Sequence, residues 1–331
     1  NMGQFIQQYK FTLASLAPVF IGSGQIYTTK EYILEDGEVY FPDMIKIYQH
    51  IAKNHPAKLD VYEEFLMNSK GGFRTERLPE ILRRLDIKSR DFGGYRLSVR
   101  DVDFTTTRGR LNEIGAFVKD AFGRPYIPGS SLKGALRTII CNEKFGCDNT
   151  PKNRHAIPWG AGNDFFHNIR VSDSKPLSTK DLIICQKIDF AKRKDRLNTL
   201  PIARECWKPR RKIEFTITCE GQEARQAMEH LIQWSNAHYQ HYKSHFLIPD
   251  SRPEYVQPVP GGVGIVYLGG GSGFWTKTVI KEAIKPRGTR KMQMVGNGVH
   301  KLTKARIEGA GLKNKENLFE MGKCIFLIEK L

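Results

Sequence analysis

Apolar residues recur along this chain with two different periods, and the change from one to the other predicts its secondary structure. Two-residue alternation rich in strand-forming residues predicts strands at 11–21, 165–171, 212–219, 263–268 and 324–328. Apolar residues at helical spacing predict helices at about 130–145 and 222–246. Asp36-Gly37 between two apolar runs predicts a hairpin, and the segments 182–190 and 199–206 predict the arms of a second one.

Without the intervening segments, these elements follow in the order strand, helix, strand, strand, helix, strand. This βαββαβ order is that of a ferredoxin-like or RNA-recognition (RRM-like) fold, in which four antiparallel strands carry two helices on one face. We therefore expect an α+β fold with large insertions and a C-terminal extension. Residues 9–218 are expected to form an RRM-like N-terminal part that contains an insertion at 42–123. Residues 219–331, with the long helix, a glycine-rich loop and a basic tail, form a C-terminal part that can complete the same core.

The segment 124–137 joins a rigid turn to the start of a helix and carries two cations. Gly129 lets the backbone turn, and one of the two serines after it is expected to cap the helix. Lys133 and Arg137 lie four residues apart, so they share a helix face near the free backbone N–H groups of the first turn. Such a corner suits a phosphate group. From this segment alone, an ordinary capped helix with solvated cations explains the pattern equally well.

Composition narrows the function classes. The 331 residues are 40% apolar, enough for a sizeable core, and carry a net charge of +17 with a pI near 9.6. This charge favours nucleic acid, an anionic membrane surface or an acidic partner. With no apolar run of about 18 residues and no signal-peptide pattern, neither a membrane span nor secretion is expected. Six scattered cysteines without a C-x-x-C pair favour reduced thiols in a cytoplasmic protein.

The excess charge is concentrated in two segments. Residues 187–212 hold ten Lys or Arg against three acidic residues, a net charge of +7, and residues 281–315 hold ten against two, a net charge of +8. A solvated surface normally mixes both signs. Two basic segments with aromatic residues nearby, among them Trp207 and Trp275, instead favour a groove that follows a nucleic-acid backbone.

Three glycine-rich segments, 21–24, 128–134 and 268–275, lie near the ends of predicted core elements. None has the spacing of a P-loop or of a dinucleotide-binding loop. Each offers backbone N–H groups that a phosphate can approach closely, with Lys133, Arg137 and Lys277 nearby. The alternative is a set of tight turns without a ligand.

The segment 127–137, IPGSSLKGALR, resembles the signature of the RAMP superfamily of CRISPR RNA-binding proteins. The segments 16–24, 169–174 and 268–278 are similar to the superfamily's first strand and loop, its second strand and its C-terminal glycine loop. Within the superfamily, GSGFWTKT at 271–278 and the Val-Ser-Asp-Ser segment at 171–174 most resemble the family of fifth subunits of the Csm effector complex of type III-A CRISPR systems. The resemblance covers most of the chain.

This resemblance implies a non-catalytic subunit at the head of the Csm backbone, which binds the 3′ part of the CRISPR RNA (crRNA) and is needed for crRNA maturation and antiviral defence. Its implied partners are the crRNA, the neighbouring Csm backbone subunit and other Csm subunits, with no cofactor and no metal. The family's backbone subunit cuts target RNA with an aspartate in the loop after its first strand. Here that loop reads QIYTTK at 25–30, without an aspartate, which argues against cleavage. The predicted RNA-binding residues are Gly22, Ser23, Gly24, Gly129, Ser130, Ser131, Lys133, Arg137, Gly269, Gly270, Gly271, Ser272, Gly273, Phe274, Trp275 and Lys277.

Two alternatives remain. One is a repeat-processing CRISPR endoribonuclease that uses a histidine with a tyrosine or lysine. Four histidines at 230, 238, 241 and 245 share one predicted helix, and the last three could face one metal, but no cysteine or carboxylate joins them at ligand spacing. The other alternative is a protein-interaction subunit that recruits a host nuclease, its basic segments meeting acidic partners.

Overall fold

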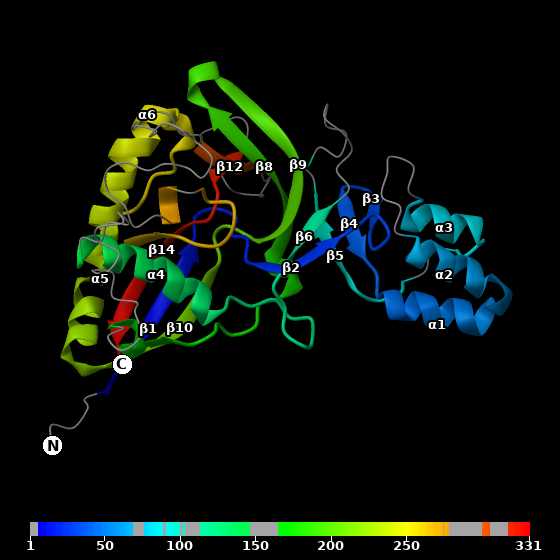
Figure 1. The fold of residues 1–331 in the computed structure, drawn as a ribbon, viewed down its shortest axis with the longest axis horizontal. Coiled ribbons are helices and arrows are strands. Elements are labelled where there is room, and N and C mark those ends of the chain that lie inside the picture. The colour runs from blue at the N-terminus through cyan, green and yellow to red at the C-terminus, as the bar shows by residue number, and fades with distance from the viewer. Residues whose placement is uncertain are drawn as a thin grey trace.

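The computed structural model describes residues 6–68, 76–88, 91–99, 102, 113–145, 165–273, 275–277, 300–304 and 317–331. These residues form three β-sheets and several helices, so the predicted mixed α+β class is confirmed. In Figure 1, α4 (Gly129–Glu143) and α5 (Gly221–Tyr242) lie over one sheet, and three further helices form a lobe at the right. Within the described residues, no helix is long and apolar enough to cross a membrane.

The core sheet has five antiparallel strands in the order β11-β14-β1-β10-β7. Their bounds are β1 (Ile6–Ser15), β7 (Ile169–Val171), β10 (Lys212–Glu220), β11 (Gly264–Tyr267) and β14 (Lys323–Lys330). Along the chain α4 precedes β7, and α5 follows directly on β10. β1 is central because it pairs along most of its length with both β10 and β14.

Alternation along β1 places every second side chain on the face that carries the helices. Phe11 is fully buried opposite Phe215 of β10, and its ring stacks on Phe326 of β14 with 4.7 Å between the ring centroids. Leu132 of α4 and Leu231 of α5 belong to the same buried cluster. Burial of each such side chain contributes about 1.5–3 kcal/mol, which fixes both helices on the sheet.

The second sheet has six strands in the order β13-β12-β8-β9-β6-β2. Their bounds are β2 (Gly22–Tyr27), β6 (Ile114–Phe117), β8 (Leu182–Ala191), β9 (Arg196–Trp207), β12 (His300–Lys304) and β13 (Leu318–Glu320). β6 and β9 run parallel, and the other neighbouring strands run antiparallel. The β8–β9 pair confirms the hairpin predicted over 182–206.

A small sheet and three helices form the lobe at the right of Figure 1. The strands are β3 (Ile33–Glu35), β4 (Glu38–Phe41) and β5 (Tyr95–Ser98), and the helices are α1 (Met44–Asn54), α2 (Leu59–Met67) and α3 (Leu78–Arg84). β3 and β4 form the hairpin predicted at Asp36-Gly37. The helices bury Ile47, Tyr62 and Ile81 in a core cluster of their own, separate from that of the core sheet.

Glu205 of β9 ties the second sheet to this lobe. Its side chain is fully buried, and one carboxylate oxygen accepts a hydrogen bond from the Tyr95 hydroxyl of β5. The other oxygen accepts from the Phe117 backbone N–H (2.8 Å) and the Lys119 ammonium (2.5 Å). A buried carboxylate is stabilised by such donors, so Glu205 holds β5 of the small sheet beside the second sheet.

Three predicted bounds were wrong. The segment 165–171 is not one strand, because residues 165–168 form a 3₁₀ turn and β7 covers only Ile169–Val171. The apolar run at 11–21 is not one strand, because β1 ends at Ser15, whose hydroxyl donates to the Lys208 carbonyl (2.7 Å). The chain then turns through Pro18 into β2. The long helix also does not end near residue 246, because α5 passes into a π-helical turn, η6 (Lys243–Leu247), and then into α6 (Ile248–Asp250). Further single turns are η1 (Pro56–Lys58), η3 (Phe165–Asn168), η4 (Thr179–Asp181), η5 (Lys192–Lys194), η7 (Pro253–Tyr255) and η8 (Trp275–Lys277).

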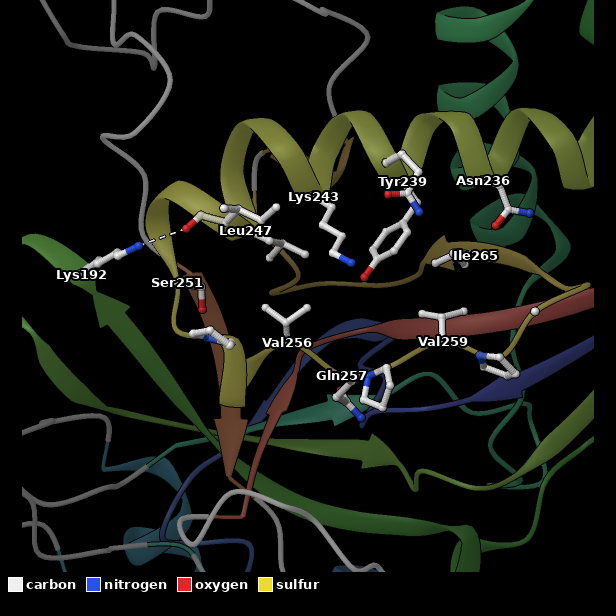
Figure 2. A pocket seen from close by; sticks show the side chains of 16 residues that line it. Lys192, Asn236, Tyr239, Lys243, Leu247, Ser251, Val256, Gln257, Val259 and Ile265 are labelled. Atoms are coloured by element: carbon white, nitrogen blue, oxygen red, sulfur yellow. Dashed lines mark hydrogen bonds between the residues drawn. The ribbon is translucent and has the colours of Figure 1, made fainter.

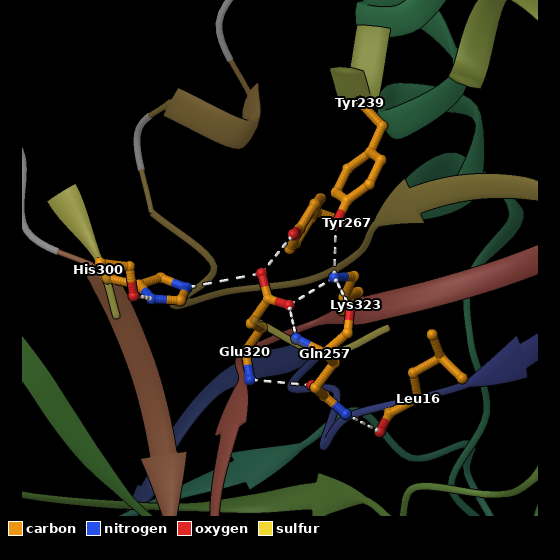
Figure 3. A network of polar contacts seen from close by, with 8 residues as sticks. Leu16, Tyr239, Gln257, Tyr267, His300, Glu320 and Lys323 are labelled. Carbon is orange, nitrogen blue, oxygen red and sulfur yellow. Dashed lines mark hydrogen bonds and ion pairs between the residues drawn. The ribbon is translucent and has the colours of Figure 1, made fainter. Parts of the chain in front are cut away.

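A buried ion pair lies where the chain passes from β13 of the second sheet to β14 of the core sheet (Figure 3). The Lys323 ammonium donates to Glu320 Oε2 (2.5 Å), to the Tyr239 hydroxyl (2.9 Å) and to the Gln257 carbonyl (2.7 Å). Glu320 also accepts from the Tyr267 hydroxyl (2.8 Å) and the Gln257 N–H (2.7 Å). These contacts join α5, β11 and both sheets.

The pKa values of this pair follow from its burial. Burial alone would raise the pKa of Glu320, but the charge of Lys323 and the contact with His300 lower it to about 2. Burial lowers the pKa of Lys323, and the charge of Glu320 opposes that change. Near neutral pH the carboxylate is therefore ionised in the folded chain.

Candidate nucleic-acid interface

A groove of about 400 Å³ lies where the start of β2, the first half of α4 and the loop after β11 meet. Predicted site residues from all three glycine-rich segments line it, although these segments lie far apart in the sequence. They are Gly22, Ser130, Ser131, Gly269, Gly270 and Lys277. Phe20, Thr138 and Tyr267 also line the groove.

The loop after β11 approaches the chain before β2 so closely that only glycine fits. Gly269 has a φ of +80°, and a Cβ atom there would lie 2.2 Å from the Phe20 carbonyl oxygen. The same oxygen accepts a hydrogen bond from the Gly270 N–H, at 2.7 Å. A side chain at 269 would therefore separate two walls of the groove.

Gly322, in the turn between β13 and β14, forms hydrogen bonds with the two segments that lead into the groove. Its N–H donates to the Pro18 carbonyl (2.9 Å), and its own carbonyl accepts from the Leu268 N–H (2.8 Å). With a φ of +80°, a Cβ atom at 322 would lie 2.5 Å from the Leu268 oxygen. Since Glu320 and Lys323 flank this turn, their ion pair supports the groove.

Two cations lie beside the glycine loop. The Lys277 side chain reaches solvent while its ammonium donates to the Gly269 carbonyl. Partial burial there lowers the pKa of Lys277, and the nearby charge of Arg204 lowers it further. The Arg204 guanidinium lies against Gly271, with a nitrogen 2.1 Å from where a Cβ atom would be, and 5.1 Å from the centre of the Phe20 ring.

The positive charge continues across the second sheet. Burial lowers the pKa of Lys187 on β8, Asp189 opposes that change, and the charges of Lys301 and Arg204 lower the pKa further. Lys301 of β12 lies beside Gly273 and pairs with Asp189 at 2.8 Å. Cations that lower one another's pKa form a site of positive potential, which attracts an anion.

The structure places Lys133 and Arg137 on another side of α4. The Lys133 ammonium donates to the Phe166 carbonyl (2.7 Å), and the Arg137 guanidinium lies 4.9 Å from the centre of the Phe166 ring. Ser130 and Thr138, two helical turns apart, instead face the groove. The RNA contacts of Lys133 and Arg137 remain a prediction.

The predicted serine cap of this helix is wrong. α4 begins at Gly129, and its N-cap is Pro128, which makes no side-chain cap. Ser130 and Ser131 therefore lie inside the first turn, and the Gly129 N–H donates to the Asp173 carboxylate at 2.7 Å. Gly129 is required for a close approach, because a Cβ atom there would lie 2.3 Å from the Val171 carbonyl oxygen.

The segment 22–24 is also not a loop. Gly22, Ser23 and Gly24 form the exposed start of edge strand β2, where the pairing with β6 shifts register after Gly22. The Ser23 hydroxyl donates to the Ala116 carbonyl at 3.3 Å. These residues form a strand because their backbone pairs with the free edge of β6. The local sequence does not show that this edge is available.

In the loop after β11, Ser272 is buried and accepts a hydrogen bond from the Thr276 hydroxyl (3.0 Å), so its side chain holds the loop together. Phe274 and the side chain of Trp275 lie outside the described residues, as does most of the basic segment 281–315. Within the described part of the chain, no three His, Cys, Asp or Glu side chains could hold one metal ion. The His241 and His245 rings lie 4.0 Å apart and contact each other.

Arg204 is the residue that sequence reasoning missed. It lies in the basic segment 187–212, which marked the region but not the residue. Burial alternates around this residue, with Ala203 and Glu205 buried on one side of β9 and the partly exposed Arg204 between them on the other. Alternation of buried and exposed positions is the signal that could have identified Arg204. It could be used only with knowledge of how β9 pairs with its neighbouring strands.

The chain is similar to known proteins over nearly its whole length. The model of the RAMP superfamily matches residues 12–303. The CRISPR system Cms protein Csm5 of Streptococcus thermophilus is 39% identical, over 98% of each chain, and that of Mycobacterium tuberculosis H37Rv is 32% identical, over 99% of this chain and 100% of the relative. A chain of the Csm–crRNA–target RNA ternary complex of a type III-A CRISPR-Cas system has a TM-score of 0.66 at 17% identity, with 96% of this chain and 100% of that chain covered. The crystal structure of T. onnurineus Csm5 has a TM-score of 0.56 at 19% identity, with 80% and 90% covered. At these identities the two structures show a shared fold.

Proposed function

Because the chain belongs to the RAMP superfamily and, within it, to the Csm5 family of type III-A CRISPR systems, we propose that it is a non-catalytic RNA-binding subunit of a Csm complex. It holds the 3′ part of the crRNA at the head of the complex's backbone and is needed for crRNA maturation and antiviral defence. Its partners are the crRNA, the neighbouring backbone subunit and other Csm subunits, in the cytoplasm.

The observation that carries this proposal is the meeting of three glycine-rich segments around one groove, with Lys277 and Arg204 beside it. The exposed Ser130 hydroxyl offers a donor to phosphate oxygens, and the two cations supply charge. Such contacts position an RNA backbone and carry little sequence information. Binding should therefore depend strongly on salt and weakly on base sequence.

The chemistry of the groove supports holding RNA over cutting it. Cleavage at a 2′-hydroxyl needs a group that accepts its proton, most often a histidine or carboxylate within hydrogen-bond reach. The described residues that line the groove supply hydroxyls, amides and one ammonium, but no imidazole or carboxylate.

The fold supports the same assignment. We propose that β1, α4, β7, β10, α5 and β14 form a ferredoxin-like core in the βαββαβ order, with β11 added at one edge. The strand order β14-β1-β10-β7 and the position of both helices on one face support this. On this reading the C-terminal part, 219–331, supplies β14 beside β1 of the N-terminal part, 9–218, so the two parts share one core.

The test is RNA binding by the double variant Arg204→Ala/Lys277→Ala. Fluorescence anisotropy with a labelled single-stranded RNA should show affinity reduced at least tenfold, since each lost charge-assisted contact weakens binding by about 1.5–3 kcal/mol. The slope of log affinity against log salt should fall by about 1.4, because each phosphate contact on a single strand contributes about 0.7. The matched control Lys53→Ala/Lys330→Ala removes two exposed lysines away from the groove and should bind normally. Equal affinities for both double variants would refute the site.

Lys133 and Arg137 are tested separately, because they contact Phe166 and not the groove. If they bind RNA, Lys133→Ala/Arg137→Ala will lower RNA affinity and the amount of mature crRNA in assembled complexes. Unchanged values for both would remove these two residues from the interface and leave the groove assignment intact.

A further inference from the structure

A second cavity, of about 630 Å³, lies between α5 and the segment 253–261 (Figure 2). It shares no lining residue with the groove. Its volume falls within the range of about 300–1,000 Å³ that is typical of pockets for small ligands. Neither the RAMP resemblance nor the proposed RNA contacts account for it.

One wall of this cavity is apolar. Val256, Val259 and Ile265 lie along its floor in Figure 2, and Leu247 and the Tyr239 ring face it from α5 and the turn that follows. Pro258 and Pro260 also line it. A wall of rings and branched side chains suits a flat, weakly polar body better than a hydrated ion.

The polar groups of the cavity favour an anion. The Lys243 ammonium points into the cavity in Figure 2, and within the described residues it makes no hydrogen bond or ion pair. Lys192 lies at one end, where its ammonium donates to the Ile248 carbonyl (3.0 Å). No described lining residue is acidic, and Glu320 nearby is already paired with Lys323. The cavity is therefore positively charged.

Amide groups add hydrogen-bonding capacity beside the apolar wall. The side-chain N–H groups of Asn236 donate to the Ile232 and Val263 carbonyls, which leaves its carbonyl oxygen as an acceptor. Gln240, one turn further along α5, also lines the cavity, and its side-chain amide offers both a donor and an acceptor. Paired donors and acceptors next to a flat apolar surface match the edge and the face of a nucleobase better than an aliphatic chain.

We propose that this cavity binds a single nucleotide, with its phosphate on Lys243 and its base against the wall formed by Val256 and Val259. A free mononucleotide and the terminal nucleotide of an RNA strand share this chemistry. The cavity shares no lining residue with the groove, so this proposal can be tested separately from the proposed RNA contacts.

Isothermal titration calorimetry of the full chain with UMP and AMP tests the proposal. Lys243→Met should weaken binding at least about tenfold, as expected for a lost charge-assisted hydrogen bond, while Lys243→Arg should retain most of the affinity. The matched control Lys194→Met removes an exposed lysine that does not line the cavity and should bind normally. Thermal melts establish that all three variants are folded. UMP binding that is equal in wild type and Lys243→Met, or absent from wild type, would overturn the proposal.

Ligand variation tests the class of ligand and its source. Uridine and inorganic phosphate should each bind at least about tenfold more weakly than UMP, because each engages only one part of the cavity. Phosphate that binds as well as UMP, or a peptide carboxylate that binds in place of it, would refute a nucleotide site. Competition separates the two sources: a pentanucleotide with a terminal phosphate displaces UMP if strand ends fit, and only mononucleotides displace it if the cavity is closed to a chain.

Discussion

Lys323→Met tests how strongly the buried ion pair supports the fold. Lys323 has no exposed surface, and its ammonium contacts Glu320, Tyr239 and the Gln257 carbonyl. Methionine fills much of the same space but leaves the Glu320 carboxylate buried without its cation. Removing one partner of a buried pair costs about 3–5 kcal/mol. At about 2 °C per kcal/mol for a long chain, the melting temperature should fall by about 6–10 °C.

Thermal unfolding at pH 7, followed by circular dichroism, measures this effect. The double variant Glu320→Gln/Lys323→Met should recover part of the loss, because no unpaired charge remains buried. Lys10→Met is the control, since Lys10 pairs with Glu214 and Glu329 on an exposed face and its loss should leave the melting temperature unchanged. A change below about 2 °C for Lys323→Met, or a double variant less stable than the single one, would refute the reasoning.

Three further predictions follow from the groove and the buried carboxylates. Gly269→Ala should lower RNA affinity in the anisotropy assay, because a Cβ atom 2.2 Å from the Phe20 oxygen separates the walls. Since the pKa of Glu320 is about 2 in the folded chain and ordinarily 4.5, its contribution is complete above pH 4.5 and is lost as the pH falls towards 2; melts from pH 6 to 3 should fall less steeply for Glu320→Gln. Glu205→Ala should lower the melting temperature by several degrees, because it removes the acceptor that Tyr95 and Lys119 share.

Local sequence predicted the elements whose pattern reflects one buried face. The bounds of β10 and β14 were predicted to within a few residues, because a strand with one buried face alternates apolar and polar residues in its own sequence. The end of β1 could not be predicted, because the apolar run continues beyond Ser15. There the strand stops at hydrogen bonds to Lys208 and Arg211, almost 200 residues away.

The candidate site, too, was predicted only in part from the sequence. Glycine-rich segments at the ends of core elements indicated phosphate contacts, and the structure brings Gly22, Ser130 and Gly269 to one groove. Which cations accompany them was not predictable from spacing. Lys133 turns to the Phe166 carbonyl 33 residues later, and Arg204 reaches the glycine loop only through the pairing of β9.

The pairing of β1 with β10 and β14 has a consequence for synthesis. Residues 6–15 are made before both of their neighbouring strands, because β10 is made only after residue 211 and β14 consists of residues 323–330. Until residue 211 has been made, both edges of this ten-residue strand, which has one apolar face, are unpaired, and such an edge is a template for association with other chains. We therefore expect the newly made chain to rely on chaperones, and its yield to rise when chaperones are co-expressed or the temperature is lowered.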